Sequence, residues 1–111
     1  MKDDKVYLNH ILESIRRIEQ HKRAGRQKFF KSHTLQDAIL RNLQTLAEST
    51  QRLSVEIKAQ QPQIPWEEIA GFRNVLVHNY LGIELELIWA VTQNGIPELK
   101  RAILIMLAQS S

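Results

Sequence analysis

Apolar residues recur every three or four positions along most of the chain, a spacing that predicts helices rather than strands. The first such stripe follows Asp3 and Asp4, which we expect to cap a helix that ends near Ala24 and Gly25. Its members are Leu8, Ile11, Ile15 and Ile18. A second stripe predicts a longer helix from about Ser32 to Gln60. Its members are Leu35, Ile39, Leu43, Leu46, Leu53 and Ile57.

A proline-containing loop, residues 61–65, separates this second helix from the rest of the chain. Pro65 suits the first turn of a helix, because the missing N–H of proline costs nothing there. Glu67 and Glu68 follow, where negative charge is favourable beside the positive helix end. We therefore predict a third helix from Pro65 to about Tyr80.

The last third of the chain contains one ambiguous segment. Leu81, Ile83, Leu85 and Leu87 alternate as in a strand, but no second strand lies nearby to pair with them. Helical spacing continues through Trp89 and Val91, so we favour a helix here. Asn94 and Gly95 predict its end, and Ile96–Pro97–Glu98 predicts the start of a final helix. The pattern as a whole predicts an all-α bundle of four or five helices, with residues 1–111 as one domain.

Composition excludes several classes of protein. Apolar residues make up 43% and charged residues 24%, as in an ordinary globular domain rather than a disordered tail or a coiled rod. The absence of cysteine excludes disulfides, a thiol nucleophile and a thiolate metal site. No apolar run reaches the roughly 18 residues of a membrane span, and no secretory signal opens the chain. We therefore expect a cytoplasmic protein with no membrane partner.

The positive charge is concentrated in the N-terminal half. Residues 1–60 carry 12 Lys and Arg against 7 Asp and Glu, whereas residues 61–111 carry 3 against 5. A basic half suits a polyanionic partner such as nucleic acid, although an excess of this size is also common on ordinary surfaces.

The segment from Ile69 to Tyr80 has an unusual distribution of polar residues. With Arg73 at zero on a helical wheel of 100° per residue, an apolar stripe falls at about 260–320°. That stripe contains Ile69, Phe72 and Leu76. The arc from about 0° to 160° instead mixes small or apolar residues with three polar ones. This motif arc contains Ala70, Gly71, Arg73, Asn74, Val77 and His78.

The polar members of the motif arc suit phosphodiester chemistry. An arginine stays charged and presents a fixed fork of donors to phosphate oxygens. A histidine accepts and returns a proton near neutral pH, and Asn74, one turn before His78, could hold its tautomer. The alternative is purely structural, with His78 hydrogen-bonded at a helix end and Arg73 paired with Glu67 or Glu68.

At these residues the chain resembles a known family. Residues 73–80, RNVLVHNY, match the Arg-xxxx-His-x-Tyr signature of the HEPN ribonucleases, in the HepT toxin subgroup. The resemblance extends over most of the chain, in the same order as in that subgroup. It includes residues 3–8 (DDKVYL), 36–43 (QDAILRNL), 64–71 (IPWEEIAG) and 96–99 (IPEL). The sequence departs from the subgroup at residues 48–51, ESTQ, where a Gly-Glu-Ala-Ala run is usual; we expect this to affect helix packing more than catalysis.

The resemblance implies a homodimeric endoribonuclease toxin that cleaves RNA without a metal, at a cleft between two motif helices. Arg73 would stabilise the transition state and His78 would act as acid and base. Asn74 and Asp37 would support the site, with Asp37 facing the cleft. Tyr80 matches the tyrosine that a cognate minimal nucleotidyltransferase antitoxin adenylylates to silence the toxin. No cofactor is implied.

Other candidate residues leave alternatives open. The basic cluster (Lys22, Arg23, Arg26, Lys28 and Lys31) surrounds the first interhelical loop, and its role as an RNA contact or a solvated loop stays open. Phe29 and Phe30, within it, are expected to plug the bundle end. His10, His21 and His33 lack metal-ligand spacing, and Asp37 with Arg41 could be a simple helix ion pair. For the whole chain, the alternative to an enzyme is a non-catalytic helical module that binds a nucleotidyltransferase or nucleic acid.

Overall fold

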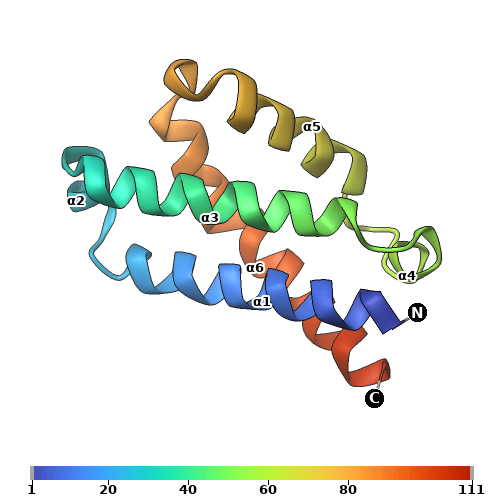
Figure 1. The fold of residues 1–111 in the computed structure, drawn as a ribbon. Helices are drawn as coiled ribbons and strands as arrows, with labels where there is room; N and C mark the ends of the chain where they lie inside the picture. The colour runs from blue at the N-terminus through green and yellow to red at the C-terminus, as the bar shows by residue number, and fades with distance from the viewer. Residues whose placement is uncertain (1, 111) are drawn as a thin grey trace.

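Every regular element in the computed structural model is helical (Figure 1), and the structure describes residues 2–110. The all-α prediction and the rejection of a strand at residues 81–87 are therefore confirmed. Over the described residues, four helices are long and two are short. They are α1 (Lys2–Lys22), α2 (Arg26–Lys31), α3 (His33–Gln51), α4 (Val55–Ala59), α5 (Trp66–His78) and α6 (Leu85–Gln109), with a 3₁₀ turn, η1 (Tyr80–Gly82), after α5.

Three long helices lie side by side, and the fourth crosses them. Figure 1 shows α3 between α1 and α5, antiparallel to both, while α6 passes behind α3 and α1. The end of α6 and the start of α1 lie at the same end of the molecule, near α4. The end of α5 and η1 lie at the opposite end, near α2. The motif helix α5 is thus an outer helix that has α3 as its main neighbour.

The predicted apolar stripes form the core. The four stripe residues of α1, Leu8, Ile11, Ile15 and Ile18, are fully buried. They meet buried residues of α3 and α6, which are Ile39, Leu40, Leu43, Leu46, Ala47, Ile88, Trp89, Ile96, Leu99, Ala102, Ile103 and Met106. Because fully burying an aliphatic side chain stabilises a fold by about 1.5–3 kcal/mol, the packing of α1 against α3 and α6 contributes strongly to stability.

The predicted helix from Ser32 to Gln60 is confirmed as far as Gln51, but the prediction of one continuous helix is wrong, because residues 52–54 break it into α3 and α4. Ser54 caps α4 by accepting a hydrogen bond from the backbone N–H of Ile57, 3.1 Å away. The buried carboxylate of Asp4 in turn accepts from the Ser54 backbone N–H at 2.8 Å and from its hydroxyl at 2.7 Å. Burial opposes ionisation of Asp4, but these hydrogen bonds outweigh it and lower its pKa. Asp3 and Asp4 lie in the first turn of α1 rather than capping it.

The predicted stop at Asn94 and Gly95 is also wrong, since α6 runs continuously through both residues and through Pro97. Proline in a helix interior removes one backbone hydrogen bond. Here one buried stripe spans the whole helix, with Ile88, Thr92, Ile96, Leu99, Ile103 and Met106 on the core side. Pro97 itself is exposed. Packing along the full length of α6 therefore overrides the local helix-breaking signal.

The first interhelical segment contains the short helix α2, which the pattern did not predict. Phe29 of α2 is buried and packs against Trp89, with ring centroids 5.3 Å apart. Phe30 contacts Phe29 edge-on at 5.2 Å and is half-buried. The expected plugging of the bundle end is therefore confirmed for Phe29.

None of the helices in residues 2–110 is both long and apolar enough to cross a bilayer.

Candidate functional site

The motif helix α5 lies on the core through the predicted stripe. Leu76 is buried, and Ile69 and Phe72 are partly buried against the core cluster. The motif arc is turned away from the core. Gly71, Asn74, Val77 and His78 are exposed, whereas Ala70 and Arg73 are half-buried. The helical wheel therefore separated the two faces of α5 correctly.

Arg73 lies on the α3 side of the motif arc. Its Nε is fully buried and makes no hydrogen bond in the described part of the chain. A carboxylate oxygen of Glu48, on α3, lies 3.9 Å from that Nε. The other side of the guanidinium donates from Nη1 to the Asn74 side-chain oxygen at 3.3 Å. The structural alternative that paired Arg73 with Glu67 or Glu68 is thus wrong, because the partner comes from the neighbouring helix.

His78 is the last residue of α5 and is exposed. The chain turns immediately after it, where the Asn79 backbone N–H donates to the Val75 carbonyl at 2.9 Å. Asn74 bonds to Arg73 and not to His78, so the expected support of the imidazole by Asn74 is absent among residues 2–110. The imidazole thus stands at an exposed helix end beside the rest of the motif arc.

Tyr80 does not continue α5. The helix ends at His78, Asn79 leaves helical geometry with φ −134° and ψ 43°, and Tyr80 begins η1. This turn is tight, since a Cβ on Gly82 would lie 2.7 Å from the Asn79 side-chain oxygen. The prediction of a helix to Tyr80 was therefore too long. Tyr80 consequently does not share the face of Arg73 by helical geometry.

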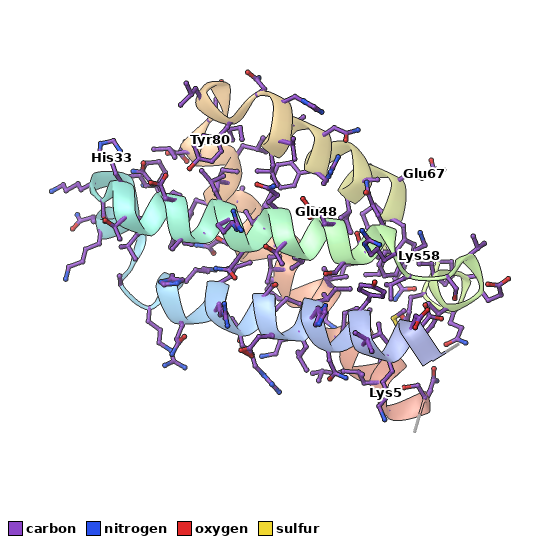
Figure 2. The ribbon with its side chains drawn as sticks, viewed as in Figure 1. Lys5, His33, Glu48, Lys58, Glu67 and Tyr80 are labelled. Atoms are coloured by element: carbon purple, nitrogen blue, oxygen red, sulfur yellow. The ribbon has the colours of Figure 1, made fainter. Side chains whose placement is uncertain are left out.

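Tyr80 turns instead toward α3 and Asp37. The Tyr80 hydroxyl donates to an Asp37 carboxylate oxygen at 2.6 Å, joining segments 43 residues apart. Figure 2 shows Tyr80 at the end of the molecule that also carries His33. The hydrogen bond to Asp37, together with burial and the negative charge of the carboxylate, raises the pKa of Tyr80. Asp37 therefore contacts the motif tyrosine rather than forming the simple pair with Arg41.

The structure separates the basic cluster into two kinds of residue. Lys22 donates to the Thr92 carbonyl at 3.0 Å and lies over the Trp89 ring, and burial lowers its pKa. Arg26 pairs with Glu86 and lies over the Phe30 ring. These two cations tie α1 and α2 to α6. The remaining three, Arg23, Lys28 and Lys31, are exposed.

No group of three or more His, Asp and Glu side chains in the described part of the chain is close enough to hold a metal ion. His10 and His33 are exposed and His21 is half-buried.

Sequence reasoning missed Glu48 as the partner of Arg73. A signal was present, because Glu48 follows Asp37 by eleven residues, which places the two about 20° apart around α3. Asp37 and Glu48 thus form a two-residue acidic stripe on α3, and each contacts a different end of the motif.

Comparison with protein families gives a clear result for this chain. Residues 11–106 match the family model described as HepT-like, "Ribonuclease HepT-like". The match covers α5, the motif arc and the acidic stripe. No solved structure gives a significant match.

Curated relatives carry ribonuclease names. A protein of Caldanaerobacter subterraneus subsp. tengcongensis, named "Putative RNase", is 35% identical over 93% of this chain and 93% of its own length. "Probable ribonuclease HepT" of Thermococcus cleftensis is 33% identical over 86% of this chain and 88% of its own length. A Methanocaldococcus jannaschii protein named "Gamma-glutamylcyclotransferase and putative RNase" is 43% identical over 93% of this chain, but the chain spans only 47% of that relative's length.

Proposed function

The chain belongs to the HepT-like ribonuclease family, and from that premise we propose that it is a metal-independent endoribonuclease toxin, silenced by adenylylation of Tyr80. The observation that carries the proposal is the motif arc. It presents a half-buried arginine and an exposed histidine on the outer face of one helix. The ribonuclease names of the relatives support RNA as the substrate.

Each motif residue has one task in this reaction. The 2′-hydroxyl of the RNA attacks the adjacent phosphorus, forming the new P–O bond as the bond to the 5′-oxygen breaks. His78 takes the 2′-hydroxyl proton or returns one to the leaving 5′-oxygen. Arg73 donates to the equatorial oxygens, where negative charge develops. Asn74 supports the site by accepting a hydrogen bond from Arg73.

A homodimer would complete this chemistry. The reaction needs a base at the start and an acid at the end, and one motif arc supplies a single histidine. Two arcs facing each other about a twofold axis would supply two His78 and two Arg73 side chains in one groove. Exposed apolar side chains suit such pairing; these are Val77 in the arc, and Val75 and Leu81 outside it, the last 97% exposed.

Tyr80 offers a place for control by the cognate minimal nucleotidyltransferase. Its hydroxyl would attack the α-phosphorus of a nucleoside triphosphate held by that partner. The Tyr80 Oη–P bond forms, the bond to pyrophosphate breaks, and Asp37, already at 2.6 Å, accepts the proton. The product carries a negative phosphodiester and a base on η1, which begins two residues after His78, and both would oppose the binding of RNA there.

The decisive experiment is incubation of the purified protein with total RNA in the presence of a chelator. Wild type should fragment the RNA, and Arg73→Ala should not. A strict requirement for divalent metal would contradict the mechanism. If neither protein cleaves but both bind RNA or a nucleotidyltransferase, the chain is the non-catalytic interaction module instead.

Control through Tyr80 is tested by co-expression with the nucleotidyltransferase and measurement of intact mass. Wild type should gain adenylate mass and lose activity, whereas Tyr80→Phe should gain none and stay active. Unmodified Tyr80 in an inactivated wild-type protein would contradict this mode of control.

A further inference from the structure

The buried side of Arg73 faces Glu48 on α3, a residue to which the motif assigns no role. Figure 2 labels Glu48 on α3, the helix beside α5, and its carboxylate oxygen lies 3.9 Å from the Arg73 Nε. That Nε has no hydrogen-bond partner in residues 2–110 and no contact with solvent. At this distance the contact is an attraction between charges and not a hydrogen bond.

The Glu48 carboxylate is itself held in place. Gln44, one turn earlier on α3, donates from its side-chain amide to the same Glu48 oxygen at 3.2 Å. On the other side of Arg73, Asn74 accepts a hydrogen bond from Nη1. The guanidinium therefore lies between a carboxylate that Gln44 holds and the side-chain amide of Asn74. Its Nη2 group makes no hydrogen bond within the described residues, so it is available to a substrate oxygen.

We propose that Glu48 is a positioning residue for Arg73. Its charge holds the Nε edge of the guanidinium against α3, so that the opposite edge is directed at the phosphate before RNA binds. An arginine that is already oriented stabilises developing charge without reorganising during the reaction. The inference rests on the proposed role of Arg73 in RNA cleavage.

If Glu48 had no positioning role, removing its charge should raise activity rather than lower it. A carboxylate near the site repels the phosphates of RNA, so its removal should strengthen binding and raise kcat/KM. Removal of a positioning carboxylate should instead lower kcat while KM stays the same or falls. A fall in kcat therefore indicates a positioning role, whereas tighter binding without a fall in kcat indicates simple repulsion.

The experiment compares Glu48→Gln with wild type on a labelled single-stranded RNA at fixed ionic strength. The amide keeps the shape of the side chain but removes its charge, so we expect kcat to fall about tenfold with KM unchanged or lower. Glu48→Asp keeps the charge on a shorter side chain and should restore part of the loss. Glu67→Gln, which removes an exposed carboxylate from α5 itself, is the matched control and should leave kcat unchanged. A Glu48→Gln protein with wild-type or higher kcat would overturn the proposal.

A second measurement is independent of cleavage. In ¹⁵N nuclear magnetic resonance spectra, the Arg73 Nε–H of wild type should exchange slowly with water because it is buried. Glu48→Gln should speed that exchange and shift the resonance, while thermal melting stays as in wild type. An unchanged Arg73 signal would overturn the positioning role whether or not the protein cleaves RNA. Absence of cleavage by wild type, with the signal shifted as expected, would instead refute only the proposed function.

Discussion

α3 and α5 lie side by side but differ in how they use their side chains. α3 has eight buried residues among 19, whereas α5 has only Leu76 fully buried among 13. The apolar side of α3 contacts α1, and its acidic stripe reaches toward α5. α5 contributes a narrow apolar stripe to the fold and leaves the motif arc outside it.

This difference predicts which substitutions change stability and which change activity. Burial is the dominant favourable term in folding, so substitutions in the core face of α3 should change the free energy of unfolding. Substitutions of the exposed residues of the motif arc remove little buried area and should change function more than stability. The acidic stripe joins the two, because Asp37 and Glu48 belong to the stable helix but contact the motif residues Tyr80 and Arg73.

The largest effect is expected at His78. His78→Ala removes the proposed acid and base, and cleavage of a labelled RNA should fall by about 10²–10⁴-fold. The side chain is exposed at a helix end, so the thermal melt followed by circular dichroism should match wild type. His33→Ala, also exposed but outside the motif arc, is the control and should cleave normally. A wild-type rate for His78→Ala would show that the motif histidine has no part in the reaction.

In the core of α3 we expect the reverse, a loss of stability with no loss of activity. Ile39→Ala removes a fully buried side chain and should lower the free energy of unfolding by about 2–5 kcal/mol in urea titrations. The cleavage rate per folded molecule, measured well below the melting temperature, should stay the same. Val55→Ala, at a residue that is 77% exposed, should change stability by no more than about 0.5 kcal/mol. Equal stability of Ile39→Ala and wild type would contradict the assignment of α3 to the core.

A smaller effect is expected from a charge placed in the motif arc. Val77→Lys would set two like charges near the proposed twofold axis and should weaken dimerisation by roughly tenfold or more, about 1.4 kcal/mol. Light scattering should show a lower solution mass, together with lower cleavage at matched concentration. Val55→Lys, on α4 and away from the arc, is the control. A monomeric Val77→Lys protein that cleaves as well as wild type would refute the shared cleft.

The smallest effect concerns the contact between Asp37 and Tyr80. Tyr7→Phe leaves Tyr80 as the single tyrosine, so its phenolate can be titrated by ultraviolet absorbance. In that background Asp37→Asn should lower the pKa of Tyr80 toward the ordinary tyrosine value, because the carboxylate raises it. Asp3→Asn, which removes an exposed carboxylate from α1, should leave it unchanged.

The same shift predicts how stability varies with pH. A pKa that is raised by folding favours the protonated phenol in the folded state. The contribution of the Asp37–Tyr80 contact to stability is therefore fully present below the ordinary tyrosine pKa. It is lost as the pH rises through the folded value, and Asp37→Asn should reduce that loss, because only burial then raises the pKa of Tyr80. The same alkaline loss in Asp37→Asn would show that another group causes it.

The sequence alone determined the class of fold and the two faces of the motif helix. Helical periodicity depends only on residue spacing, so it identified the buried stripe of α1 and the stripe of Ile69, Phe72 and Leu76 on α5. The same periodicity placed Arg73 and His78 together on the face that the structure leaves outside the core. The family signature was likewise evident from the sequence, because it depends only on the order and spacing of its residues.

Tertiary structure decided where helices end and which helices supply partners. Asp4 stabilises the Ser54 cap from 50 residues away, and core packing along α6 carries that helix through Pro97. Spacing within α3 puts Asp37 and Glu48 on one stripe but does not say which helix that stripe faces. Only the antiparallel packing of α5 on α3 brings Asp37 to Tyr80 and Glu48 to Arg73. Contacts between helices depend on how the helices pack, which residue spacing within one helix does not specify.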